Sequence, residues 1–192
     1  MSTQNLNGLV LAGGRSSRMG SDKSQINYHG QPQYVHLVNL LASHCDKVFL
    51  SCKTNQSFAD VDVIRDSFAI DTPLNGILSA MEQHPEVAWL SVPVDIPSIT
   101  DDTFRYLISH RDTKKMATCF FDSEGERPEP LLTIWEPAAL PAMKMFYEAG
   151  GYSPRKFLES HPIKLVAAPD VNMLTNINTT SDMNAYKKDA GL

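Results

Sequence analysis

Residues 8–23 decide the fold class, and they read GLVLAGGRSSRMGSDK. The first five residues form a short, glycine-bounded apolar run, which is typical of a buried strand. The stretch that follows carries three cations within nine residues (Arg15, Arg18 and Lys23) and two serine hydroxyls. Glycines allow backbone N–H groups to approach a ligand closely, and fixed cations balance the charge of a polyphosphate. The segment therefore predicts a phosphate-binding loop after a buried strand.

This loop differs from two common phosphate-binding patterns. Gly20 is followed by Ser-Asp-Lys, whereas a Walker A loop has Lys-Ser/Thr after its last glycine. The segment also lacks G-x-G-x-x-G, which disfavours a dinucleotide-dependent oxidoreductase. On composition alone, a solvated glycine-rich turn with surface arginines stays open as the simpler alternative.

Short apolar runs alternate with helical patterns along the rest of the chain. We expect further strands at residues 47–52, 61–65, 88–94, 116–121, 131–135 and 163–168. We expect helices after Pro32 and at residues 74–83, 101–111, 138–148 and 180–189. Such alternation predicts a single α/β domain over residues 1–192, with three layers and a mostly parallel sheet. Ligands of these sheets bind outside the carboxyl ends of the strands.

Asp95 directly follows the most strand-like run of the chain, residues 88–94. A lone carboxylate at that edge could hold a hard cation, since Mg²⁺ is commonly bound by one or two carboxylates together with phosphate oxygens and water. The alternative is an acid that caps the next helix. The cationic loop after the first strand favours the metal interpretation.

Composition bounds the protein class. The chain has 192 residues, and 17 basic against 22 acidic residues give a formal net charge of −5, which disfavours a nucleic-acid partner. No apolar run approaches the roughly 18 residues of a membrane helix, and the N-terminus lacks a targeting pattern. The three cysteines form no C-x-x-C pair, and two histidines, His36 and His44, are too few for a metal site. We expect a soluble cytoplasmic protein with reduced thiols.

The glycine-rich loop resembles the signature of the MobA-like nucleotidyltransferases, the molybdenum cofactor guanylyltransferases. Five further segments are similar to family motifs and occur in the family's order. They are Val63–Asp66, Pro73–Ala80, Val92–Pro97, Glu129–Leu131 and Asn176–Thr179. The resemblance covers the whole chain and implies a Rossmann-like nucleotidyltransferase fold.

The resemblance also implies roles for individual residues. It implies nucleotide contacts from the loop, GTP binding by Lys23 and Asp66, and a Mg²⁺-mediated contact to GTP from Asp95. Asn176 and Asn178 are expected on the pterin side of the cleft. Without the resemblance, Asp66 is explained as a turn residue and the two asparagines as helix N-caps. The implied loop contacts are Leu11, Ala12, Gly13 and Gly14.

The reaction that the resemblance implies is transfer of GMP from GTP to the terminal phosphate of molybdopterin, with release of pyrophosphate. A phosphate monoester is largely dianionic near neutral pH, its second pKa being about 6, so this nucleophile needs no general base. The enzyme must then position the two reacting phosphates and neutralise their negative charge. We assign these roles to Arg18, Lys23 and Asp95, with GTP and molybdopterin as substrates and Mg²⁺ as cofactor. Contacts with other cofactor-biosynthesis proteins fit the same scheme.

Several positions depart from the family's pattern and leave base selectivity open, among them Val94, Ile96 and Thr180. Thr72 stands where a glycine is expected, Asn75 replaces an alanine, and Ser51 replaces a frequent asparagine. The sister activity, molybdopterin cytidylyltransfer, is one rival, although its loops tend to read L-A-A-G where this chain has L-A-G-G. A GTP-binding module without catalysis is the rival from another class, and the presence of both Lys23 and Asp95 argues against it.

Overall fold

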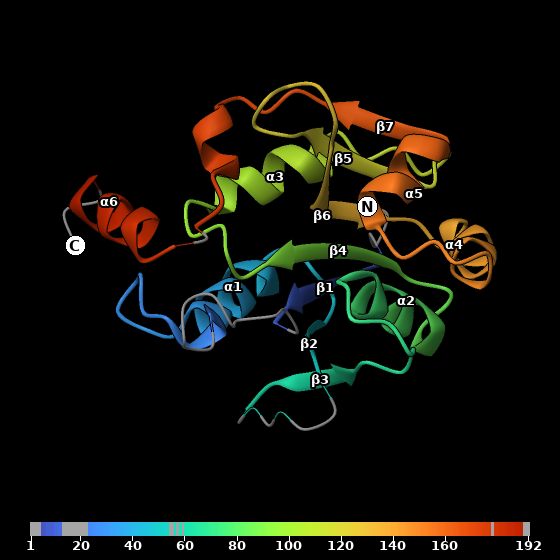
Figure 1. Ribbon diagram of the computed structural model, residues 1–192, viewed down its shortest axis with the longest axis horizontal. Helices are drawn as coiled ribbons and strands as arrows, with labels where there is room; N and C mark the ends of the chain where they lie inside the picture. Colours follow the sequence, from blue (N-terminus) through green and yellow to red (C-terminus); the bar gives the residue numbers. More distant parts are fainter. Residues whose placement is uncertain are drawn as a thin grey trace.

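The computed structural model describes residues 5–12, 23–53, 56, 58, 60–177 and 179–189. Its strands are β1 (Leu6–Leu11), β2 (Val48–Cys52), β3 (Asp62–Arg65), β4 (Ala88–Pro93), β5 (Ala117–Phe121), β6 (Pro128–Trp135) and β7 (Ile163–Val166). They form one seven-stranded sheet in the order β3-β2-β1-β4-β6-β5-β7. Figure 1 shows β1 and β4 side by side at its centre, with both arrows pointing left.

Most neighbouring strands are parallel, and β6 is the exception. β1 pairs in parallel with β2 and β4, β2 with β3, and β5 with β7. β6 runs antiparallel to both β4 and β5. The beginning of β6 therefore lies at the sheet edge where β1, β2, β3 and β4 end.

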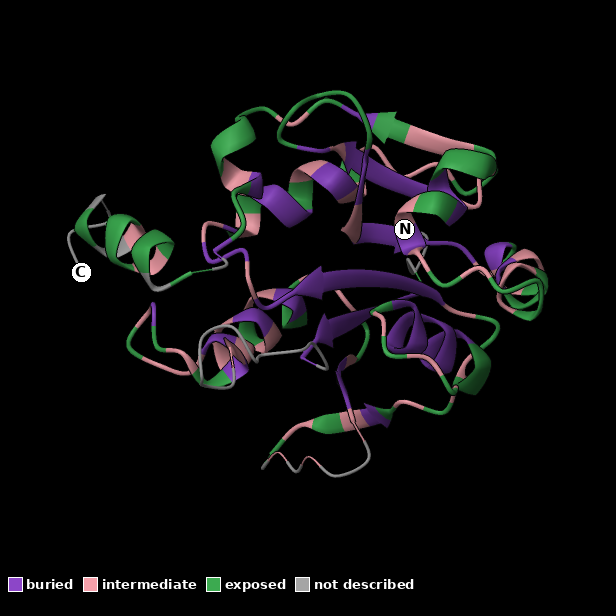
Figure 2. Cartoon of the chain, viewed as in Figure 1, coloured by how far each residue is buried: buried purple, intermediate pink, exposed green. Residues whose placement is uncertain are grey.

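Helices cover both faces of the sheet and give the fold three layers. The helices are α1 (Gln33–Ala42), α2 (Leu74–Gln83), α3 (Asp101–Ser109), α4 (Ala139–Glu148), α5 (Pro154–Ser160) and α6 (Thr180–Asp189), with 3-10 turns η2 (Lys23–Gln25) and η3 (Val171–Leu174). One core cluster joins the sheet to α1 and α3 through Leu37 and Phe104. A second joins it to α2, α4 and α5 through Ile77, Met143 and Phe157. Figure 2 shows the central strands and α2 as buried and most of α6 as exposed.

The predicted three-layer α/β fold with a mostly parallel sheet is confirmed. Every predicted strand and helix is present, with ends displaced by a few residues. Pro141 lies in the first turn of α4, where a missing N–H costs nothing. No helix in the described part of the chain has both the length and the apolarity needed to cross a bilayer.

Sequence reasoning missed α5. The Ser153 hydroxyl caps this helix by accepting from the backbone N–H of Lys156 at 3.4 Å, and Pro154 occupies its first turn. A capping serine followed by proline is a recognised helix start, so the signal was present in the sequence.

Candidate active site

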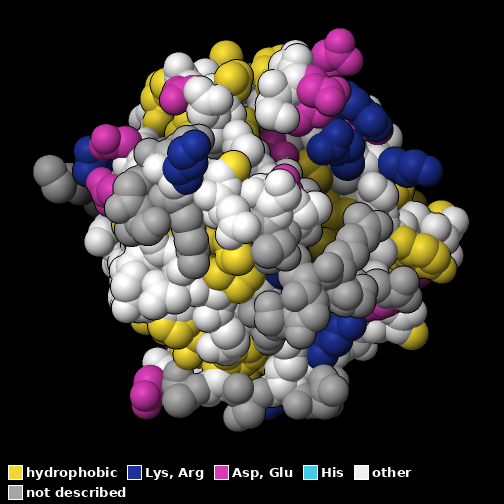
Figure 3. Space-filling model, turned by 60° about the vertical axis from the view of Figure 1, so that its left-hand side comes forward, with side chains coloured by type: hydrophobic (Ala, Val, Ile, Leu, Met, Phe, Trp, Pro, Cys, Tyr) yellow, Lys and Arg dark blue, Asp and Glu magenta, His cyan; other side chains and the backbone are white. Residues whose placement is uncertain are grey.

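The carboxyl edge of the sheet gathers the residues that the sequence singled out. Leu11 ends β1 and Ala12 follows it, while Asp66 follows β3 and Asp95 follows β4. Lys23 reaches the same edge from η2. Figure 3 turns this side of the molecule toward the viewer, and Lys and Arg side chains lie on it among acidic ones. The edge is therefore a surface of mixed charge with buried strands beneath it.

Lys23 and Asp95 are brought together by a third segment. The Lys23 Nζ lies 3.8 Å from Asp95 Oδ2 and donates a hydrogen bond to the carbonyl oxygen of Ile177 at 3.0 Å. The N–H of Ile177 in turn donates to the carbonyl oxygen of Asp95 at 2.7 Å. One residue near the C-terminal end of the sequence thus fixes both the cation and the backbone that carries the carboxylate.

The Asp95 carboxylate is short of positive partners. Its Oδ1 is buried and has no hydrogen-bond partner among the residues that the structure describes. Burial raises the pKa of Asp95, and the charge of Lys23 lowers it in part. Buried carboxylate oxygens are normally satisfied by donors or by a metal ion. The orphaned oxygen therefore fits a cation.

Tyr28 lies close enough to this carboxylate to respond to its charge. Burial, followed by the negative charge of Asp95, raises the pKa of Tyr28 to about 12. The phenol is therefore protonated at neutral pH and cannot act as a base there. Sequence reasoning gave Tyr28 no role, because nothing in its local pattern points to Asp95.

Asp66 belongs to a second group on the same edge, around the end of β2. Ser51 Oγ donates to Asp66 Oδ1 at 3.4 Å, and the N–H of Ala12 donates to the carbonyl oxygen of Ser51 at 3.1 Å. Gly76 packs directly against Ser51, because a Cβ at position 76 would lie 2.0 Å from Ser51 Oγ. Burial raises the pKa of Asp66 above its ordinary value of 3.8. Along the carboxyl edge, this group lies at the ends of β2 and β3, whereas Asp95 lies beyond the end of β4.

The structure explains two of the departures from the family pattern by local packing. The Asn75 amide donates to the carbonyl oxygens of Phe68 and Ile70 at 2.7 and 2.8 Å and accepts from the N–H of Phe68 at 3.0 Å. The Thr72 hydroxyl donates to the carbonyl oxygen of Tyr152 at 2.7 Å. Both side chains hold the connection between β3 and α2 in place.

The alternative capping roles are wrong for two of the predicted residues. The N-cap of α3 is Thr100, whose side chain forms a capping box with Thr103, so Asp95 caps no helix there. At α6 the Thr179 hydroxyl accepts from the N–H of Asp182 at 3.1 Å, which leaves Asn176 exposed and outside the cap. Predicted residues that fall outside the described part of the chain are Gly13, Gly14, Arg18 and Asn178.

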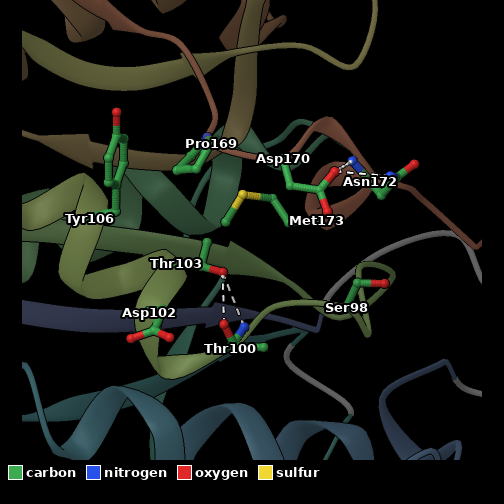
Figure 4. Close-up of a pocket in the computed structure, with 9 residues that line it drawn as sticks. All are labelled: Ser98, Thr100, Asp102, Thr103, Tyr106, Pro169, Asp170, Asn172 and Met173. Atoms are coloured by element: carbon green, nitrogen blue, oxygen red, sulfur yellow. Dashed lines mark hydrogen bonds between the residues drawn. The ribbon is translucent and has the colours of Figure 1, made fainter.

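A cavity of about 380 Å³ lies between α3 and η3. Its walls continue into the two segments that form the site, since Ser98 follows Asp95 by three residues and η3 ends shortly before Ile177. Figure 4 shows Met173 reaching from η3 toward α3, and the Thr103 hydroxyl bonded to Thr100. The described residues contain no cluster of three or more His, Cys, Asp or Glu able to hold a metal by themselves.

Comparison with known proteins identifies the family. A model described as the MobA-like NTP transferase domain matches residues 8–165, most of the chain. The chain belongs to this family. It is therefore a nucleotidyltransferase, as the loop and the edge carboxylates indicated.

Two relatives of this MobA-like chain are named for steps of molybdenum cofactor biosynthesis. It is 29% identical over 184 residues to a molybdenum cofactor guanylyltransferase of Pseudomonas fluorescens, across 93% of this chain and 92% of that protein. It is 33% identical over 181 residues to the molybdenum cofactor biosynthesis bifunctional protein of a Synechocystis species, across 92% of this chain. The chain spans 52% of that bifunctional relative, about half its length.

Solved structures share the fold. The molybdopterin-guanine dinucleotide biosynthesis protein A of Archaeoglobus fulgidus superimposes with a TM-score of 0.80 at 16% sequence identity. The match covers 96% of this chain and 98% of that one. At this identity the likeness establishes the architecture alone.

Proposed function

We propose that this MobA-like nucleotidyltransferase transfers GMP from GTP to the terminal phosphate of molybdopterin and releases pyrophosphate. The observation that carries the proposal is the joint placement of Lys23 and Asp95 by Ile177, at the edge where the glycine-rich loop begins. A guanylyltransferase relative that matches nearly end to end supports the same reaction.

The site fits a divalent cation, for which we propose Mg²⁺. Asp95 would hold it, because its buried Oδ1 has no partner within the described residues. When bound, the ion would neutralise phosphate charge. Lys23 would stabilise the negative charge that develops on the departing pyrophosphate, since its ammonium is already fixed by the Ile177 carbonyl. Arg18 would add a second positive charge from the loop.

The chain's residues supply positioning and charge, and no described group is poised as a base. The acceptor phosphate is already largely dianionic near neutral pH, so attack requires no proton removal. Tyr28, the titratable hydroxyl beside Asp95, keeps its proton because its pKa is raised to about 12. In-line placement of the two phosphates is then the main demand on the enzyme.

The two halves of the sheet suggest separate places for the two substrates. Ala12, Ser51 and Asp66 lie on the side of β1, β2 and β3, and we assign the nucleoside of GTP to them, with Leu11, Gly13 and Gly14 as further contacts of the nucleotide. We assign molybdopterin to the opposite side of Asp95, where Asn176 is exposed beside Ile177 and where Asn178 follows in the sequence. The cavity between α3 and η3 opens on that side.

Binding calorimetry with GTP, CTP, ATP and UTP, each with and without Mg²⁺, tests the nucleotide assignment. We expect GTP to bind most tightly and to gain affinity from the metal. A preference for CTP would indicate the cytidylyltransferase activity. Tight GTP binding without pyrophosphate release on addition of molybdopterin would indicate a binding module, and no binding of any nucleotide would contradict the proposal.

A further inference from the structure

The antiparallel pairing of β4 with β6 brings a second carboxylate to the edge of the sheet at which Asp95 lies. Leu90 lies opposite Ile134, and Ser91 lies opposite Thr133, in an antiparallel register. Asp95 follows the end of β4 by two residues and Glu129 is the second residue of β6, so both carboxylates lie at the edge of the sheet where β4 ends and β6 begins. Near this edge the two strands are also joined by Ser91 Oγ, which donates to the carbonyl oxygen of Leu131 at 2.8 Å.

Glu129 is buried, with 5% of the residue exposed. Burial raises the pKa of Glu129, and the negative charges of Asp95 and Asp122 raise it further. The charge of Arg155 lowers the pKa of Glu129, but this guanidinium is bonded to Asp122 at 3.1 Å. The backbone N–H of Leu131 donates to Glu129 Oε1 at 3.2 Å. Within the described part of the chain, Glu129 forms no ion pair.

Glu136, which follows the other end of β6, shows how a buried carboxylate is usually stabilised. Glu136, 3% exposed, is held by Arg111, whose Nε and Nη2 donate to its two carboxylate oxygens at 2.6 and 2.9 Å. A buried carboxylate needs such a partner, because its desolvation otherwise costs several kcal/mol. Among the described residues Glu129 has no arginine of its own, and it lies close enough to respond to the charge of Asp95, which itself carries an orphaned oxygen. A cation between the two carboxylates would satisfy both.

We propose that Glu129 is the second protein carboxylate at the divalent-cation site of Asp95, supplied by β6 because that strand runs opposite to its neighbours. The inference rests on the metal-dependent transfer proposed above. It assigns Glu129 to the metal centre rather than to the packing of the strand. Two carboxylates with phosphate and water oxygens form a set of ligands suited to a hard divalent cation.

Mn²⁺ binding to the full chain without nucleotide, followed by the EPR signal of the free ion, tests this inference. We expect saturable binding by the unmodified protein. Glu129→Gln and Asp95→Asn should each weaken Mn²⁺ binding by about tenfold or more, the scale seen when partners of a metal site are removed. Glu126→Gln removes an equal charge from the exposed turn between β5 and β6 and should leave the affinity within about twofold, since exposed charges are screened.

The outcomes separate a metal role from a structural one. If Glu129 only supported the strand, Glu129→Gln would change the melting temperature and leave Mn²⁺ affinity intact, which would overturn the inference. Absence of saturable Mn²⁺ binding by the unmodified chain would also overturn it. Failure of the proposed function is a different result, because it would appear as absence of a GTP preference in calorimetry of the unmodified protein, whatever the Mn²⁺ affinity of Glu129→Gln.

Discussion

Among single residues of the carboxyl edge, Lys23 contacts two partners from different segments of the chain. Its hydrogen bond to the Ile177 carbonyl, at 3.0 Å, is shorter than its 3.8 Å approach to Asp95. A backbone oxygen thus anchors the ammonium, so its position does not depend on the ionisation of the carboxylate alone. Charges fixed in advance stabilise a transition state without reorganisation at the moment of reaction.

Lys23→Ala should therefore lower kcat for guanylyl transfer by at least about tenfold, and by up to the roughly 3 kcal/mol that such fixed donors contribute. Steady-state rates of pyrophosphate release measure the effect. Lys114→Ala, at an exposed lysine, is the control and should leave the rate unchanged. A rate close to that of the unmodified protein in Lys23→Ala would refute the role of this ammonium.

Burial of the Asp66 carboxylate, which we assign to GTP binding, lowers the stability of the folded protein when the carboxylate is ionised. Burial raises its pKa above 3.8, so the native state binds more protons than the unfolded state as the pH rises from about 4 through the raised value. The native state therefore loses stability through that interval, and the penalty is complete at neutral pH. Asp66→Asn should remove the penalty while it keeps the side-chain shape.

Urea unfolding of Asp66→Asn from pH 4 to pH 8 measures this effect. We expect the variant to be more stable than the unmodified protein near pH 7, with an advantage that shrinks toward pH 4. Asp62→Asn, at an exposed position on the same strand, should show no such trend. An advantage independent of pH would contradict the burial argument.

At the scale of elements, the contact between α2 and the end of β2 leaves no room for a side chain at position 76. A Cβ there would lie 2.0 Å from Ser51 Oγ and 2.9 Å from Ser51 Cβ. Gly76→Ala should destabilise the fold by about 1–3 kcal/mol, the usual cost of overpacking. It should also weaken GTP binding, because Ser51 would have to leave Asp66.

Chemical denaturation of Gly76→Ala, made in the unmodified chain and in Ser51→Gly, tests whether the Ser51 side chain causes the loss of stability. In Ser51→Gly the obstructing side chain is gone, and Gly76→Ala should cost clearly less there than in the unmodified chain. The same cost in both backgrounds would show that another contact, such as the Leu11 methyl 3.3 Å from the added Cβ, is responsible.

For the whole molecule, α6 lies outside the two cores. Neither core cluster of the described residues includes a residue of this helix, which lies at the left edge of Figure 1. Tyr186 connects it to the body by donating to the carbonyl oxygen of Pro97 at 3.3 Å and by packing edge-on against Tyr28. In contrast, Leu174 of η3 is buried in the first core.

A chain that ends after residue 178 should therefore still fold, with a modest loss of stability to which the aromatic pair and the hydrogen bond of Tyr186 contribute about 2 kcal/mol. A chain that ends after residue 170 also lacks Leu174 and Ile177, and it should lose several kcal/mol more and all measurable turnover. Thermal denaturation and pyrophosphate release compare the two. Equal stability of both truncated chains would contradict this division.

The sequence by itself determined the local elements and the edge of the sheet to which it assigned its candidate site residues. Apolar runs, proline and capping residues act over a few positions, so they located β4 and its terminal Asp95, α2, and the first turn of α4 around Pro141. Lys23 was singled out as a cation of the glycine-rich loop and Asp66 through the family resemblance, and both lie on the predicted edge of the sheet. Tyr28 and Glu129 received no role, because their partners are distant in sequence.

Only the tertiary structure decided which distant segments meet. Lys23 bonds to Ile177, 154 positions away, and no periodicity or spacing encodes that contact. The reversed direction of β6 is what brings Glu129 to the edge of the parallel strands, and it depends on the strand being inserted between β4 and β5. Local preferences fix each element, whereas burial of the two helical layers against one sheet selects the arrangement that creates the site.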